Sequence, residues 1–283
     1  MSRDRIFRST VIVGLCTAMS RVLGLLRNMV MASVFGTNLV QSAFVIAFRI
    51  PNLFRALFGE GALSAAFVPV FMETLEKEGN DSAHRLAGRA MALLGVLLGA
   101  VVLAGMAGAT LYMHFGDPGE RARIVLPLMR IMLPYTFFIC LVALCMGILN
   151  SYRHFVVPAL TPVILNVVWI MGVWWVCPLF GATEEEQIHG AAWSVLVAGA
   201  VQLAMQFPMM RRLKIRIPLS LVWHDVKVRR IMFLMGPAAL GMGVFQINVL
   251  IGSMLAFFVA PWAPAALSFA EFLVYLPQGM FAT

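Results

Sequence analysis

Long runs of apolar residues without any charged side chain dominate the pattern of this chain. Five such windows are Ala90–Met113, Ile131–Tyr152, Phe155–Thr183, Gly190–Met210 and Ile231–Ala270. A helix needs about 20 residues to cross the hydrocarbon core of a bilayer, so each of the first four windows predicts one transmembrane helix. The fifth is long enough for two: one span to about Phe258, a turn at Pro261 and Pro264, and the opening of another.

The N-terminal part of the chain is equally apolar but is interrupted by arginines. Ser9–Met72 is long enough for two more spans, and the segment Phe35-Gly36-Thr37-Asn38 separates them. The basic N-terminus followed by an apolar run is also typical of a signal peptide. No small-residue cleavage site precedes Arg21, so we expect a retained first span. About eight spans are therefore predicted, the eighth incomplete or barely complete at Thr283.

The composition indicates a membrane protein. Of the 283 residues, 61% are hydrophobic and only 12% are charged, which excludes an ordinary soluble domain. The predicted fold class is all-α: a polytopic bundle of transmembrane helices. The four cysteines lie in or beside apolar runs without metal-ligand spacing, so we expect no disulfide framework, no metal site and no cofactor.

The distribution of the 21 Lys and Arg side chains predicts the orientation. With the N-terminus inside, 14 fall in inside segments and three in outside segments, and the acidic stretch Glu184-Glu185-Glu186 lies outside. Cytoplasmic loops carry an excess of Lys and Arg, so we expect a cytoplasmic N-terminus. The same excess of Lys and Arg in cytoplasmic loops accounts for the net charge of +8, so we do not expect a nucleic-acid partner.

The second span is predicted to be broken. Pro51 removes a backbone hydrogen bond and disfavours helical geometry at Ile50, so a kink or break is expected there. Gly59 and Gly61 loosen the helix again. Broken helices at membrane depth occur where they line a cavity or are buried in protein, and transporters commonly place binding sites there. The pentapeptide at 48–52 (FRIPN) also resembles that at 274–278 (VYLPQ), which leaves open whether spans seven and eight repeat spans one and two.

The candidate binding residues lie in the first two spans. They are Arg21, Arg27, Arg49, Asn52, Arg55 and Glu60. Four arginines facing lipid would cost on the order of 10–14 kcal/mol on insertion scales, so they are expected to face a wet cavity instead. On a helical wheel Arg49 and Glu60 lie nearly in line and are expected to be able to pair. Arginine forks donate bidentately to phosphate, so the cavity is predicted to hold a diphosphate. Snorkelling to head groups and structural pairing remain open alternatives.

Other polar and aromatic side chains fit structural roles. Trp169, Trp174, Trp175 and Trp193 are typical of lipid-facing or interfacial aromatics. The amides of Asn166, Gln202, Gln246 and Asn248 favour hydrogen bonding between helices over ligand contact. The acids Glu73, Glu76, Glu78 and Asp81 read as a solvated face. No phosphate-binding loop, nucleophile elbow or catalytic carboxylate pair is present, so we do not expect an enzyme.

Several of these stretches together resemble the MurJ/MviN lipid II flippases of the multidrug/oligosaccharidyl-lipid/polysaccharide exporter superfamily. They are SRVLGLLRN at 20–28, FRIPNLFRALFGEGALSAAFVPVF at 48–71 and MGPAALGMGVFQIN at 235–248, with further likeness between them. The resemblance implies fourteen spans in two lobes. Residues 1–230 would form the six-helix first lobe and 231–283 the start of the second, so the chain looks like the N-terminal portion of a longer protein.

The resemblance also implies a function. Such a protein moves undecaprenyl-diphosphate-linked peptidoglycan precursor (lipid II) from the inner to the outer leaflet of the bacterial plasma membrane by alternating access. Its partners would be lipid II, membrane lipids and possible cell-wall synthesis proteins, with the oligomeric state open. The family's cavity arginines match Arg21, Arg27 and Arg55, its basic residue before the Pro-Asn turn matches Arg49, and its acidic residue matches Glu60.

The chain departs from the family pattern at three positions. Many members carry acidic residues where this chain has Asn28 and Ser42, and an arginine where it has Phe272. Two alternative functions therefore remain: a related exporter of another lipid-linked polysaccharide, and a non-transporting, degenerate or scaffold paralogue.

Overall fold

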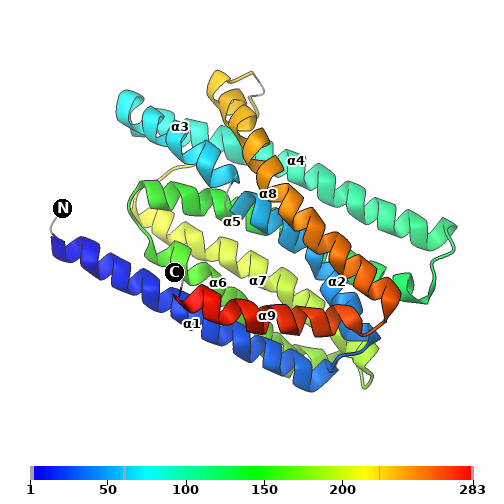
Figure 1. The fold of residues 1–283 in the computed structure, drawn as a ribbon. Helices are drawn as coiled ribbons and strands as arrows, with labels where there is room; N and C mark the ends of the chain where they lie inside the picture. The colour runs from blue at the N-terminus through cyan, green and yellow to red at the C-terminus, as the bar shows by residue number, and fades with distance from the viewer. Residues whose placement is uncertain (1–2, 60–61, 223, 282–283) are drawn as a thin grey trace.

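The computed structural model describes residues 3–59, 62–222 and 224–281, and every regular element within them is a helix (Figure 1). In chain order these are α1 (Arg3–Phe35), α2 (Leu39–Phe54), η1 (Arg55–Gly59), α3 (Ala62–Glu78), α4 (Asn80–Phe115), α5 (Glu120–Ser151), α6 (Val156–Met171), η2 (Gly172–Val176), η3 (Cys177–Leu179), α7 (Glu184–Arg212), α8 (Val226–Val259) and α9 (Ala263–Phe281). Six helical segments in the described part are long and apolar enough to cross a membrane. The predicted all-α, multi-pass membrane fold is therefore confirmed.

The remaining helices complete the predicted set of about eight spans. The two short helices α2 and α3 supply the interrupted second span, and the 19-residue α9 supplies the eighth. The long helices extend beyond the charge-free windows: α4 begins at Asn80 and α5 at Glu120. Charged residues at helix ends reach the head-group layer and can belong to the same helix. A charge-free window is therefore shorter than the helix that contains it.

The two predicted turns are confirmed. Gly36 adopts a φ of +61° and its N–H donates to the Ala32 carbonyl at 3.0 Å, which ends α1. Asn38 then caps α2 by accepting a hydrogen bond from the Gln41 N–H at 3.0 Å. At the other end of the chain α8 ends at Val259 and α9 begins at Ala263, so the turn lies where Pro261 predicted it.

A kink or break is expected at Pro51, and the structure shows that the helix is not broken there. The α-helix continues through Pro51 to Phe54, and the backbone changes to a π-helical turn only at Arg55–Gly59. Neighbouring helices allow proline inside a membrane helix, and Pro51 is buried among them. π-Helical turns are frequent at functional sites, and this one begins at a candidate cavity arginine.

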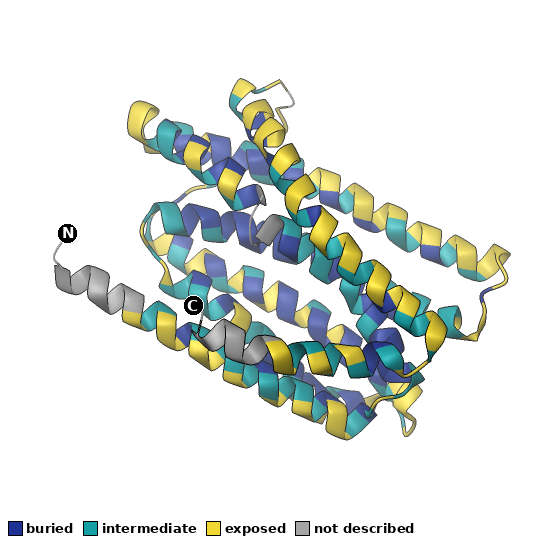
Figure 2. Cartoon of the chain, in the orientation of Figure 1, coloured by how far each residue is buried: buried dark blue, intermediate teal, exposed yellow. Residues whose placement is uncertain are grey.

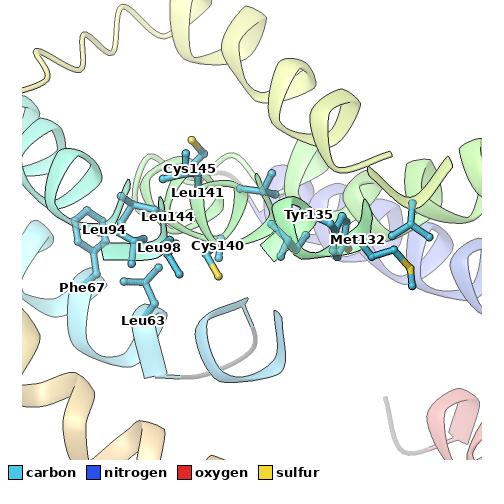
Figure 3. Close-up of a cluster of buried hydrophobic side chains, with 14 of the residues drawn as sticks. Leu63, Phe67, Leu94, Leu98, Met132, Tyr135, Cys140, Leu141, Leu144 and Cys145 are labelled. Atoms are coloured by element: carbon cyan, nitrogen blue, oxygen red, sulfur yellow. The ribbon is translucent and has the colours of Figure 1, made fainter. Parts of the chain in front are cut away.

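Helix α5 forms the centre of the bundle. In its most apolar window 72% of the residues are buried, against 11% in α1, and it packs on α2, α3, α4 and α7. Figure 3 shows leucines and a phenylalanine of α3 and α4 packed against α5 side chains such as Leu141 and Leu144. In Figure 2 the outward faces of α1, α4 and α8 are largely exposed, and apolar side chains such as Leu103 and Phe233 cover them. These faces fit contact with lipid.

Close packing of η2 on α7 gives a testable stability prediction. A Cβ added at Gly172 would lie 1.9 Å from the Ser194 Oγ and 2.3 Å from its Cβ, and that hydroxyl already donates to the Gly190 carbonyl. We expect Gly172→Ala to destabilise the protein by about 1–3 kcal/mol through overpacking. The matched control is Gly99→Ala, where a Cβ meets nothing within 4 Å. Thermal unfolding in detergent would contradict this packing if both variants unfolded at the same temperature.

The beginning of α8 is tied to α3 and α4 by ion pairs. Arg89 of α4 binds Asp225, and Arg230 and Lys227 bind Glu73 and Glu78 of α3 at 2.9 and 2.6 Å. Burial disfavours the ionised Asp225 carboxyl, but hydrogen bonds from the backbone amides of α8 and from Arg89 outweigh it and lower its pKa. The carboxylate therefore stabilises the fold above its ordinary pKa, and this contribution is lost as the pH falls through the lowered value.

Candidate functional site

A cavity of about 630 Å³ lies between α1, α2, α6 and α9. Figure 1 shows α9 running beside α1, and α9 also contacts α2. The polar side chains that line the cavity are Thr17, Ser20, Arg21, Arg27, Asn28, Gln41, Arg49, Asn52, Arg55, Asn166, Ser268 and Glu271. Its volume is in the range of small-molecule binding sites, so it can accept a charged head group.

Five of the six candidate residues from the sequence line this cavity. Arg21 and Arg27 come from α1, Arg49 and Asn52 from α2, and Arg55 from the first position of η1. The sixth, Glu60, lies outside the described residues. The arginines that the sequence spreads over two helices thus meet around one space.

Arg27 is held by three neighbours. Its guanidinium donates to the Asn28 Oδ1 at 3.1 Å and to the Asn166 Oδ1 at 3.1 Å, and its Cζ lies 4.5 Å from the ring centre of Trp169. Cation–π contact with tryptophan stabilises the positive charge of the guanidinium. The two amide contacts are neutral acceptors, so the positive charge of Arg27 is oriented by them but not neutralised.

The sequence favours Asn166 as a bridge between helices over a ligand contact, and the structure gives it both an interhelical bond and a place in the cavity wall. Its Nδ2 donates to the Ser20 carbonyl at 3.0 Å, which joins α6 to α1. That bond fixes the amide so that its oxygen faces Arg27. The amide is therefore both interhelical and part of the cavity wall.

The expectation that Trp169 faces lipid was wrong. Its side chain is 3% exposed, lies beneath Arg27 and donates from its Nε1 to the Met31 sulfur at 3.4 Å. Trp174, Trp175 and Trp193 are exposed, as a lipid-facing position requires. An aromatic residue is equally compatible with lipid and with a cavity wall, so hydropathy cannot separate the two.

Arg55 and Arg49 have partners of different kinds. Arg55 donates from Nε to the Asn52 Oδ1 at 2.9 Å, one helical turn earlier. Arg49 forms an ion pair with Glu271 of α9 at 2.9 Å, with side chains 16% and 31% exposed. Arg49 therefore pairs across the cavity with α9, a partner that the helical wheel of the second span could not show.

The cavity carries an excess of positive charge. Its described lining contains four arginines and a single carboxylate, Glu271. Arg27 and Arg55 lie close enough to repel each other electrostatically, so each makes the charged form of the other less favourable. An anion between them would relieve this repulsion and accept bidentate hydrogen bonds. Among the described residues no cluster of metal-binding side chains offers an alternative chemistry.

Comparison with known proteins gives a consistent picture. The family model described as lipid II flippase MurJ matches residues 31–283. A relative from Rhizobium tropici named as a probable lipid II flippase MurJ is 37% identical over 276 residues, covering 95% of this chain and 51% of the relative. The chain spans about half the length of the curated relatives it matches.

Solved structures share the arrangement of helices. One described as lipid II flippase MurJ in an inward closed conformation matches with a TM-score of 0.76 and 26% identity, over 96% of this chain and 56% of that one. An inward-facing transporter of the multidrug resistance MATE family, in the MOP superfamily, matches with a TM-score of 0.71 and 18% identity, over 92% of this chain and 60% of that one. The second likeness concerns the fold alone. With the matched family model covering most of its length, the chain belongs to the lipid II flippase MurJ family.

Proposed function

We propose that the protein moves undecaprenyl-diphosphate-linked peptidoglycan precursor, lipid II, from the inner to the outer leaflet by alternating access. The observation that carries this proposal is the convergence of Arg21, Arg27, Arg49 and Arg55 on one cavity whose described lining has a single carboxylate. Such a cavity suits a diphosphate, because each phosphate carries a negative charge and several acceptor oxygens.

The cavity residues divide into three roles under this proposal. Arg27 and Arg55 bind the phosphates directly, and Asn52 and Asn166 hold their guanidinium groups in orientation. Arg49 exchanges its partner Glu271 for the substrate. Binding is thus a competition between phosphate oxygens and the acceptors that the arginines already have.

The same proposal covers the lobes and the location. We infer that residues 1–230 form the first lobe and 231–283 begin the second, with the cavity between α9 and the first lobe. The family supports a transporter that performs no covalent chemistry and resides in the bacterial plasma membrane. The excess of Lys and Arg supports a cytoplasmic N-terminus. Lipid II and bilayer lipids are the proposed partners, with cell-wall synthesis proteins as possible additional ones.

One observation favours an alternative cargo, a lipid-linked polysaccharide precursor. The Phe272 ring of α9 packs against Gly24, with its Cζ 3.3 Å from the place of a Cβ there. Beside it, Glu271 faces Arg49. Helix α9 thus brings an aromatic ring and an acid to the cavity, which changes the space and charge beside the phosphates and could select another head group.

Transport by the full-length protein in proteoliposomes tests the proposal. We expect fluorescent lipid II to cross the bilayer. A polyprenyl monophosphate carrying the same sugar should cross about tenfold more slowly, because it lacks one of the two anionic groups. Growth of bacteria depleted of their own flippase should be restored by the gene. Transport confined to a polysaccharide-linked lipid would favour the alternative, and no transport of either would indicate a degenerate paralogue.

A further inference from the structure

Tyr135 of α5 is a fully buried residue whose hydroxyl has no apparent structural purpose. Its relative exposure is 0%, and the hydroxyl has no hydrogen-bond partner in the described part of the protein. A buried hydroxyl without a partner destabilises a fold, and phenylalanine would fill the same space without that penalty. Such a cost points to a function where a second observation joins the residue to a site.

The ring of Tyr135 is fixed from two sides. On one side it lies 6.1 Å from the ring of Phe48 in α2. On the other side α7 approaches so closely that a Cβ at Gly199 would lie 2.6 Å from the Tyr135 Cδ2. Figure 3 places Tyr135 on α5 beside Met132. A ring held this way keeps its hydroxyl at one position in the bundle.

That position is next to the anion cavity. Phe48 lines the cavity, and Tyr135 packs behind it as a second layer. The charged groups that act electrostatically on the Tyr135 hydroxyl are Arg55 and Arg27, which both line the cavity. The hydroxyl therefore stands near the two guanidinium groups to which the proposed function assigns the phosphates.

We propose that Tyr135 is a positioning residue for the anion site, whose phenolic oxygen accepts a hydrogen bond from Arg55 when a diphosphate is bound. The inference rests on the proposed function. Arg55 already donates from Nε to Asn52, and a guanidinium has five N–H donors in a rigid plane. A phosphate occupies one edge of that plane, and the tyrosine oxygen would fix another edge. In the loaded state the hydroxyl gains a partner that the described residues do not give it.

The variant Tyr135→Phe separates this role from packing. It removes the oxygen and keeps the ring, so we expect unfolding at the same or a higher temperature together with roughly five- to tenfold weaker binding of undecaprenyl diphosphate. The matched control is Thr136→Val on the same helix, which also removes a buried hydroxyl without a partner. It should stabilise the protein equally and leave binding unchanged.

A double-mutant cycle with Arg55→Lys tests whether the hydroxyl acts through Arg55. In the Arg55→Lys background, Tyr135→Phe should have little further effect on binding, because lysine cannot span both acceptors. The inference is overturned if Tyr135→Phe binds as tightly as wild type, or if its effect is undiminished beside Arg55→Lys. If the wild-type full-length protein binds no undecaprenyl diphosphate, the proposed function fails as well; if it binds and Arg27→Ala weakens binding, only the tyrosine inference is at stake.

Discussion

Arg27→Ala and Arg55→Ala are each expected to abolish growth of flippase-depleted bacteria while the variant proteins still insert into the membrane. Both guanidinium groups line the cavity, and Arg27 is oriented toward it by Asn166 and Trp169. Hydrogen bonds to charged partners contribute about 1.5–3 kcal/mol each, so either change should weaken diphosphate binding tenfold or more. Insertion should not suffer, since an arginine at bilayer depth is itself unfavourable for insertion.

Two further variants make this result specific. Arg27→Lys keeps the charge but loses the planar fork and the stacking on Trp169, so partial growth is expected. Arg229→Ala removes an exposed arginine outside the cavity and should grow as wild type. Protein levels in membrane fractions serve as the check on insertion. Normal growth of the Arg27→Ala, Arg55→Ala double variant would contradict the anion-cavity account.

The arrangement of the spans could be predicted from the sequence because the bilayer imposes one strong rule. Every backbone polar group in the hydrocarbon must be satisfied inside its own helix, so apolar length alone identifies a span. The turn-forming residues Gly36 and Asn38 predicted the boundary between α1 and α2, and Pro261 predicted the boundary between α8 and α9. The need to keep several arginines away from lipid gave the candidate cavity residues.

The contacts inside the cavity could not be predicted in the same way. Arg27 and Asn166 are 139 residues apart, and Arg49 and Glu271 are 222 residues apart. Pairing over such separations depends on how each helix is rotated in the bundle, which composition does not determine. The hydroxyl of Tyr135 is a further example, because only the packed structure shows that it lacks a partner.

Reversing the charge at either end of the Arg49–Glu271 pair is expected to stop transport, and reversing both should restore part of it. The pair joins α2 to α9, and the Ser42 hydroxyl accepts a hydrogen bond from the Ala265 N–H between the same helices. Arg49→Glu or Glu271→Arg brings like charges together in a half-buried site. Breaking a fully buried pair costs about 3–5 kcal/mol, which sets the upper bound for this partly exposed one. In the double variant the two charges still attract each other, with the carboxylate now on α2 and the guanidinium on α9. Growth of depleted bacteria and thermal unfolding measure the two effects.

The variant Glu271→Gln decides between two roles of this ion pair. Either the pair is a permanent structural contact between α2 and α9, or Glu271 competes with the substrate for Arg49. If Arg49 exchanges Glu271 for phosphate, removing the carboxylate charge should tighten binding of undecaprenyl diphosphate severalfold, because nothing must be displaced. Transport should nevertheless slow, since Arg49 of α2 no longer has a charged partner on α9 to return to after release. Arg49 also has a buried Nε without a partner, which a phosphate oxygen could satisfy. Weaker or unchanged binding in Glu271→Gln would instead make Arg49 a structural residue and leave the anion to Arg21, Arg27 and Arg55.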